Sequence, residues 1–533
     1  MTYKKLLAVA IFSTLPFTAN ADQYQDTYTS YIEQDPTITA NLYPEIDVDL
    51  FSPYFLSTPR DTFTTYKEMV KFMTRIAEDN DWAELNYLGK SGEGKKIPYL
   101  TLSNNEGKNK KVRAWLQGAI HGNEPSSNEA LLALLGNLEQ DQKGTSKLLS
   151  NMDIIVIPVI NADGVEYFQR RNSRSLDLNR DHLKMASDET LQVKQLFTEF
   201  NPHVVADSHE YGPGSYTLSK FGDEGYEKYY DVLVASARNP NIDSAIRDLS
   251  NGPFLKDMQK SMDKYDISHE IYSTYGSGDN GYVKVTEAGT SAIIGRNQAG
   301  LTNTITYLFE TRGIGLGDQH FQRRVVSMLK LNESFLASTM KNRNKILKTI
   351  EKAENETIYE GLTASNNIIL KTESPIEYKD YTFVDLANKS TVTMEVEYHS
   401  TTDVTSTLEV TRPYAYILPP AYGDIIEKLE ALGIEVTKTT GKMTKLVEAY
   451  NITESSPSSS LYEGVFRNYI TGIEPVMREI TFPKGTYIIS MAQPNADLAA
   501  ITLEPESTDS YATFGLIPVS SGDQYPVFRD VGY

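Results

Sequence analysis

The sequence contains no cysteine among its 533 residues. This absence excludes disulfides, thiolate ligands for a metal ion and a cysteine nucleophile. Any metal site in the chain must therefore be built from histidine, aspartate and glutamate side chains.

The chain also lacks an excess of positive charge and, beyond its first 21 residues, a long apolar run. Its formal net charge of -20 argues against nucleic acid or an anionic membrane surface as a partner. A membrane helix needs about 20 apolar residues, so we expect no membrane span after processing of the N-terminus. No G-x-S-x-G pattern surrounds Ser208, so a serine hydrolase is not favoured.

The first 21 residues have the three parts of a secretory signal peptide. Lys4 and Lys5 precede an apolar segment at 6–17, and Ala-Asn-Ala at 19–21 is a small-residue cleavage site. We therefore predict that residues 1–21 are removed and that the protein is exported, either to a periplasm or out of the cell.

The length predicts more than one domain. Residues 22–61 are polar and proline-rich, typical of an irregular lead-in. Over 62–348, apolar strand runs alternate with helical stretches, which predicts an α/β domain whose mixed, largely parallel sheet is flanked by helices. Over 355–533, alternating apolar and polar residues predict a smaller α+β domain, with a loop at the serine-rich stretch 452–460.

Apolar runs and their periodicity indicate the individual elements of the α/β part. The predicted strands cover 114–120, 153–160, 202–208 and 304–310, and the predicted helices cover 65–80, 128–140 and 323–338.

Polar residues cluster where the predicted strands end. His121 and Glu124 follow the first strand, Asn-Ala-Asp-Gly at 161–164 follows the second, His209 follows the third and Glu310 closes the fourth. Ligands of an open α/β sheet bind outside the carboxyl ends of its strands, so we expect these residues to converge.

Two imidazoles and one carboxylate form a suitable ligand set for a catalytic zinc ion. His121, Glu124 and His209 provide that set. The alternative is that His121 and Glu124 form only a polar turn, and that Glu310 pairs with the neighbouring Arg312.

A basic segment at 169–183 reverses the acidic character of the chain. It places Arg170, Arg171, Arg174 and Arg180 around Asn179. Guanidinium groups bind carboxylates in bidentate fashion, so the segment suggests an anionic target, the alternative being a solvated basic loop.

Together these motifs resemble the zinc carboxypeptidases of the carboxypeptidase A type over residues 62–348. The motifs, in their order along the chain, are H-G-N-E at 121–124, N-A-D-G at 161–164, D-L-N-R-D at 177–181, His209 and F-E-T-R-G at 309–313.

The resemblance implies one zinc ion per chain, held by His121, Glu124 and His209. It also implies that Glu310 is the general base, which takes a proton from the attacking water and passes it to the leaving amine.

For the substrate, the resemblance implies that Asn179 and Arg180 bind the C-terminal carboxylate of a peptide. An upstream arginine would stabilise the oxyanion; Arg174 or Arg171 suits this role, and we expect Arg174 in it with Arg171 at the substrate.

The family also has a tyrosine that caps the substrate. Tyr272, Tyr275 and Tyr282 are its candidates, and Arg296 is a further candidate for an anion contact.

These features predict a zinc-dependent metallocarboxypeptidase that hydrolyses C-terminal peptide bonds of peptides with a free carboxylate. One alternative uses the same centre as an amidase or endopeptidase on cell-wall peptides, or as a deacylase. A non-catalytic peptide-binding protein is a third interpretation, and it requires a missing ligand or base.

Overall fold

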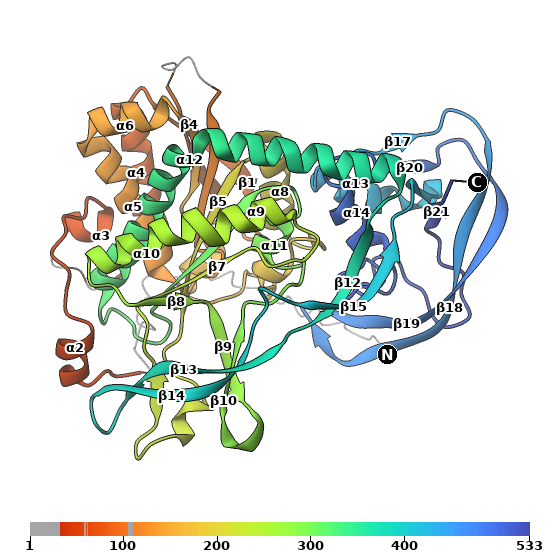
Figure 1. Ribbon diagram of the computed structural model, residues 1–533. Helices are drawn as coiled ribbons and strands as arrows, with labels where there is room; N and C mark the ends of the chain where they lie inside the picture. Colours follow the sequence, from red (N-terminus) through yellow and green to blue (C-terminus); the bar gives the residue numbers. More distant parts are fainter. Residues whose placement is uncertain (1–31, 58–59, 61, 105–109, 533) are drawn as a thin grey trace, which may run out of the picture.

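The computed structural model describes residues 32–57, 60, 62–104 and 110–532. An eight-stranded mixed sheet forms the centre of the N-terminal part (Figure 1). In sheet order, its strands are β1 (Ala83–Lys90), β2 (Lys96–Leu102), β4 (Met152–Ile157), β3 (Val112–Gly118), β5 (Val204–Tyr211), β11 (Ile305–Arg312), β7 (Val232–Ser236) and β8 (His269–Ile271).

The central strands β4, β3, β5 and β11 are parallel, and β7 and β8 are parallel to each other. The pairs β1–β2, β2–β4 and β11–β7 are antiparallel. The predicted α/β class with a mixed, largely parallel sheet is confirmed.

Helices cover both faces of this sheet, and the apolar strands follow from that. In β3, Ala114 and Leu116 belong to one hydrophobic cluster, whereas Trp115 belongs to another with Phe197. Successive strand residues point to opposite faces, so a strand covered on both sides must be apolar throughout.

The first face is covered by α4 (Tyr66–Asp79), α5 (Pro125–Gln140), α10 (Leu255–Lys264) and α12 (Phe321–Thr363). The second face is covered by α8 (Asp188–Phe200) and α11 (Gly295–Gly300). The helices predicted at 65–80, 128–140 and 323–338 are confirmed. Helix α4 begins with a capping box in which Thr65 and Glu68 satisfy each other's backbone N–H groups.

A second sheet joins two distant parts of the sequence. Its five strands, in order, are β6 (Tyr226–Lys228), β13 (Ile376–Asp385), β14 (Ser390–His399), β10 (Val283–Glu287) and β9 (Ser273–Ser277). Strands from the predicted C-terminal domain therefore complete a sheet whose other strands come from the N-terminal part (Figure 1).

The remaining C-terminal residues form the sheet-rich region predicted from the alternation. Its six-stranded sheet contains β17 (Thr437–Lys438), β20 (Tyr487–Ser490), β16 (Ala415–Leu418), β21 (Phe528–Asp530), β18 (Met443–Tyr462) and β19 (Val465–Phe482). Helices α13 (Gly423–Ala431) and α14 (Ala496–Leu503) accompany it, and β12 (Asn367–Glu373) pairs with β15 (Thr405–Thr411).

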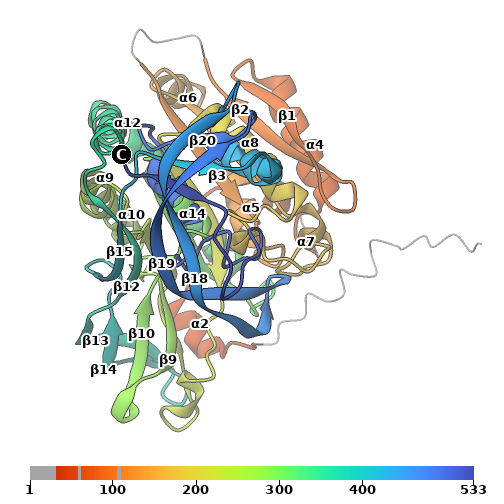
Figure 2. The same cartoon turned by 90° about the vertical axis from the view of Figure 1, so that its right-hand side faces the viewer.

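The loop predicted at 452–460 is wrong. These residues lie within β18, which pairs with β19 in a long hairpin (Figure 2). The backbone ladder to β19 orders this exposed polar stretch, although its serines suggested a loop.

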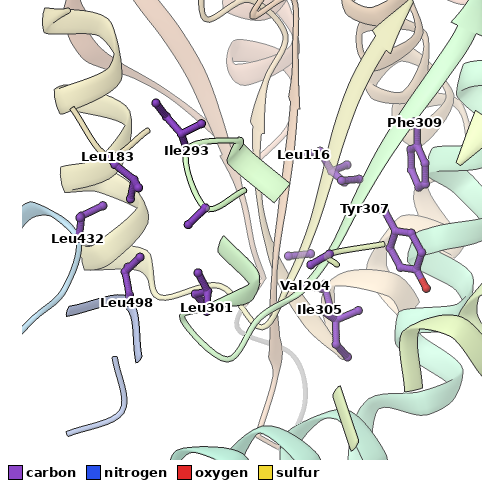
Figure 3. Close-up of a cluster of buried hydrophobic side chains, with 14 of the residues drawn as sticks. Leu116, Leu183, Val204, Ile293, Leu301, Ile305, Tyr307, Phe309, Leu432 and Leu498 are labelled. Carbon is purple, nitrogen blue, oxygen red and sulfur yellow. The ribbon is translucent and has the colours of Figure 1, made fainter. Parts of the chain in front are cut away.

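The two regions share one hydrophobic cluster. Leu183 and Ile293 lie close to Leu432 and Leu498 of the C-terminal region (Figure 3). Helix α12 also continues through residues 349–354, where the sequence suggested a boundary. The domain limits 62–348 and 355–533 stay a prediction.

In the predicted lead-in, two short helices, α2 (Pro36–Leu42) and α3 (Pro53–Leu56), interrupt irregular chain. The predicted signal peptide at 1–21 lies outside the described residues, so export also stays a prediction. Within the part of the chain that is described, the helices are all too short or too polar to cross a bilayer.

Candidate metal centre and substrate cavity

The ends of strands β3 and β5 bring His121, Glu124 and His209 together. Glu124 Oε1 lies 2.8 Å from His121 Nδ1, and Glu124 Oε2 lies 3.0 Å from His209 Nδ1. The two Nδ1 atoms are 3.1 Å apart. All three side chains are buried, and their candidate ligand atoms lie within 4.8 Å of one another.

The loop that carries the first two of these residues packs directly on the N-A-D-G turn. A Cβ atom at Gly122 would lie 1.9 Å from the carbonyl carbon of Gly164, so only glycine fits there. Asn161 accepts a hydrogen bond from the Gly164 N–H at 2.8 Å and caps the short helix α7 (Ala162–Glu166). The second motif thus supports the backbone of the first.

Two further carboxylates orient the imidazoles. Asp177 lies 3.1 Å from His121 Nε2, and Asp207 lies 3.1 Å from His209 Nε2. A carboxylate at Nε2 holds the proton there and leaves the Nδ1 lone pair for a metal ion. This donor set, two nitrogens and one carboxylate converging on one point, fits zinc.

The sequence interpretation missed both of these carboxylates, although it contains a signal for each. Asp207 stands two residues before His209, which places both side chains on the same face of β5. Asp177 opens the same D-L-N-R motif that carries Asn179.

The acidity of Glu124 agrees with its place in this cluster. Burial opposes ionisation of Glu124, but the two imidazoles outweigh it and hold the pKa of Glu124 well below its usual value. The ligand carboxylate is therefore charged, as a metal ligand must be.

Glu310 lies on β11, in register with His209 on the neighbouring strand β5. Its Oε2 is buried without a hydrogen-bond partner, and burial raises the pKa of Glu310 to about 7. The predicted alternative, a pair with Arg312, does not form, because Arg312 bonds to Glu227 at 2.6 Å instead.

The arginines of the basic segment separate into two groups. Arg170 bonds to Asp177 through Nε and Nη2 at 3.0 and 2.8 Å, and its Nη1 lies 3.2 Å from His121 Nδ1. Arg171 pairs with Glu463. Arg174, whose side chain is 56% exposed, lies 3.6 Å from Asp188.

This arrangement corrects the expected positions of two arginines. Arg171 and Arg174 turn away from the ligand cluster because carboxylates elsewhere hold them, and Arg170 is the arginine beside His121. The sequence pattern did not distinguish these arginines, since each pairs with a different carboxylate, and the partner of Arg171 lies 292 residues away.

Asn179 and Arg180 line the cavity in front of Glu310, which has a volume of about 440 Å³. Asn179 Oδ1 accepts a hydrogen bond from the Gly295 N–H at 3.0 Å. Arg180 Nη1 donates to the carbonyl oxygen of Asn179 at 2.7 Å. These contacts fix both side chains at the wall of the cavity.

Only one of the three candidate tyrosines lines this cavity. Tyr272 does so, and burial raises its pKa. Tyr275 packs against Tyr381, and Tyr282 bonds to Glu395 at the surface.

Comparisons with known proteins agree with this geometry. Residues 69–227 match the family model described as zinc carboxypeptidase. The chain is 39% identical over 513 residues to carboxypeptidase 2 of Trichophyton rubrum. This alignment covers 93% of this chain and 94% of that protein. It is 38% identical over 528 residues to carboxypeptidase 2 of Trichophyton equinum, which covers 96% of each chain.

Among solved structures, the chain matches carboxypeptidase A from Helicoverpa armigera with a TM-score of 0.42 and 15% identity, over 60% of this chain and 80% of that one. The full-length sequence similarity establishes that the chain belongs to the zinc carboxypeptidase family and is a metallopeptidase.

Proposed function

We propose that this protein hydrolyses the C-terminal peptide bond of peptides with a free α-carboxylate, with Glu310 as the general base. The observation that carries the proposal is the position of the Glu310 carboxylate. It lies beside His209, has one unpartnered oxygen and shares its cavity with Asn179 and Arg180.

His121, Glu124 and His209 would hold the zinc ion, one per chain. When bound, zinc supplies a Lewis acid that polarises a carbonyl group and makes water a nucleophile near neutral pH. Asp177 and Asp207 keep the two imidazoles in the tautomer that a metal ion requires.

Glu310 holds and moves the proton. Its buried carboxylate, with one unpartnered oxygen, is positioned to accept a proton within the cavity. From the same position in the cavity, the Glu310 side chain can then return that proton to the leaving amine.

The arginines bind and orient the substrate. Arg180 and Asn179 would hold the α-carboxylate, which fixes the scissile bond one residue away. Arg170, which lies beside His121, would donate to the carbonyl oxygen where negative charge develops. Asp177 holds the Arg170 guanidinium in that orientation before any substrate arrives.

The test uses the mature protein, a mixed pool of peptides and mass spectrometry. We expect chelator-sensitive loss of single C-terminal residues. Glu310→Gln should slow this trimming by about 10²–10⁴-fold and retain one zinc ion per chain. The matched control is Glu78→Gln, which removes an exposed carboxylate of α4 and should leave the rate unchanged.

Full activity of Glu310→Gln would refute the mechanism. Hydrolysis confined to internal bonds, to cell-wall peptides or to acylated amino acids would refute the carboxypeptidase specificity. It would favour an endopeptidase, a cell-wall amidase or a deacylase, respectively.

A further inference from the structure

A buried arginine that forms no ion pair with any described residue is part of the cavity wall. Arg296, on α11, is 3% exposed and lines the cavity together with Ile294 and Gly289. Its Nη2 donates to the Gly289 carbonyl oxygen at 2.5 Å, but its Nε is buried without any hydrogen-bond partner. Burial lowers the pKa of Arg296 to about 10, so the side chain is still a cation near neutral pH.

Two of the three carboxylates that line the cavity are held by other groups. Glu287 accepts hydrogen bonds from the Tyr398 hydroxyl at 2.6 Å and from the backbone at residue 401. Although burial opposes it, nearby Arg238 helps hold the pKa of Glu287 below its usual value. Glu210 forms a buried ion pair with Arg324 at 2.8 Å. Glu287 and Glu210 are thus committed to other groups. The third carboxylate, Glu310, acts on Arg296 through its charge, but these two described residues form no ion pair.

Lys228 is a further cation that lines the cavity. Lys228 lies over the rings of Tyr211 and Tyr275, with its Nζ 5.1 and 5.0 Å from their centroids. Four cationic side chains, Arg170, Arg180, Lys228 and Arg296, line this cavity with three carboxylates, Glu210, Glu287 and Glu310. The cavity thus has one positive charge in excess in a chain whose net charge is -20. Such a local reversal favours an anionic ligand.

We propose that the cavity selects peptides whose C-terminal residue is aspartate or glutamate, with Arg296 binding the side-chain carboxylate. This proposal rests on the proposed function, in which Arg180 and Asn179 bind the α-carboxylate. Arg180 and Arg296 line the same cavity, which therefore offers two guanidinium groups for the two carboxylates of one acidic residue.

The charge balance explains the selectivity. An acidic side chain supplies Arg296 with its missing partner in a site shielded from water. A neutral side chain leaves the guanidinium buried and unpaired, and a basic side chain adds another positive charge.

The test compares peptides that differ only in a C-terminal Glu, Gln, Leu or Lys. Glu and Gln have nearly the same shape, so their ratio of kcat/KM isolates the charge. We expect Glu to be preferred over Gln by about 30-fold or more, the range for losing one partner of a buried charge pair. Arg296→Met should reduce this ratio to about one, and Arg296→Lys should retain part of it.

Arg174→Met is the matched control, because it removes an exposed arginine outside the cavity, and it should preserve the ratio. Circular dichroism and zinc content would verify that each variant is folded. Equal kcat/KM for the Glu and Gln peptides with the wild-type protein would overturn the proposal. An equal loss of kcat/KM on every peptide in Arg296→Met would also overturn it, because Arg296 would then bind the α-carboxylate. Failure to trim any peptide would instead refute the proposed function itself.

A separate observation concerns the C-terminal region, whose longest hairpin reaches the metal centre. The turn between β18 and β19 contains Glu463 and Gly464, both with positive φ. The Glu463 carboxylate accepts hydrogen bonds from Arg171 Nη2 and from the Asp177 N–H, each at 2.8 Å. Its carbonyl oxygen accepts another from Lys184 Nζ at 2.8 Å.

These bonds connect the hairpin to a metal ligand through one intermediate residue. Glu463 fixes the backbone of Asp177, and the Asp177 side chain contacts both His121 and Arg170. The Glu463 side chain is only 8% exposed, so water competes little for these bonds.

The geometry points to Glu463 as a positioning residue of the C-terminal region, which keeps Asp177, and through it His121 and Arg170, in place. The test is a double-mutant cycle with Glu463→Gln and Asp177→Asn, read as zinc affinity and as separate kcat and KM values. We expect Glu463→Gln to weaken zinc binding and to lower kcat about tenfold, with little change in KM, because its target is an orienting group.

The effect of Glu463→Gln should largely disappear in the Asp177→Asn background, since the two residues act in one chain of contacts. Glu474→Gln, on an exposed part of the same hairpin, is the matched control and should change neither quantity. Independent, multiplicative effects of Glu463→Gln and Asp177→Asn, or unchanged zinc affinity in Glu463→Gln, would overturn this role.

Discussion

The two sides of the active site are held in different ways. The metal side is built at the ends of neighbouring parallel strands, where His209 and Glu310 stand in register on β5 and β11. The substrate side is built from the loop after α7 and from α11, where Arg170 and Arg296 are each oriented by a contact with a residue seven positions away in a loop.

This difference determines how each side is expected to respond to substitution. On the metal side, the backbone ladder fixes the positions of His209 and Glu310, which lie within paired strands. On the substrate side, one guanidinium is oriented by one or two hydrogen bonds, so substitution of its partner should disturb it as much as substitution of the arginine itself.

The largest effect is expected on the metal side. His209→Ala removes one of three ligands, and loss of the Lewis acid, worth several kcal/mol, should reduce peptide hydrolysis by about 10³-fold or more. Zinc content and hydrolysis, measured on the same preparation, check this. Wild-type protein stripped by a chelator should behave like the variant and regain activity with zinc; undiminished zinc affinity in His209→Ala would show that His209 is not a ligand.

On the substrate side, the comparison predicts opposite outcomes for two neighbouring arginines. Arg170→Met should lower kcat about 10²–10³-fold, as expected for removing a donor to a developing oxyanion. Arg174→Met should change kcat less than twofold, because its side chain is exposed and paired only with Asp188 at 3.6 Å. Steady-state kinetics of both variants on one peptide measures the two losses of kcat. A larger loss in Arg174→Met than in Arg170→Met would indicate that Arg174 stabilises the oxyanion.

The carboxylates behind the imidazoles provide a smaller and more selective effect. Asp207→Asn and Asp177→Asn should each weaken zinc binding about 10–100-fold, the range for groups that orient metal ligands. Asp177→Asn should also lower kcat further, since Asp177 holds Arg170 as well as His121. Competition with a chelator measures the affinity, and equal kcat values for the two variants would contradict the second function of Asp177.

The same contrast explains what the sequence predicted. The strands ending near His121, His209 and Glu310 are apolar on both faces, so their positions in the sheet follow from periodicity, and their carboxyl ends meet because the strands are parallel. The family resemblance then implied a role for each of the same residues. The structure brings His121, Glu124 and His209 together, and the roles of these residues stay a prediction.

The loop residues could not be assigned in this way. Arg170, Arg171 and Arg174 lie within five positions of one another, and only Asp177, Glu463 and Asp188 determine where each one points. Glu463 is almost 300 residues away from Arg171, in a stretch whose hairpin the sequence did not reveal. Side-chain direction in a loop is thus a property of the tertiary contacts.

The smallest predicted effect is the dependence of the rate on pH. Burial raises the pKa of Glu310 from 4.5 to about 7 in the metal-free chain, and a bound cation would lower it again by favouring the carboxylate. Glu310 must be ionised to accept a proton, so kcat/KM should fall as the pH drops through a value between these limits, by about tenfold per pH unit below it.

Initial rates on a neutral peptide, with zinc content measured at each pH, check this prediction. Because protonation of His209 would also release the metal ion, zinc retention distinguishes titration of Glu310 from loss of zinc. Glu310→Asp should move the acid limb, since a shorter side chain changes the burial of the carboxylate. A rate that stays constant below pH 4.5 with zinc bound would mean that Glu310 does not act as the base.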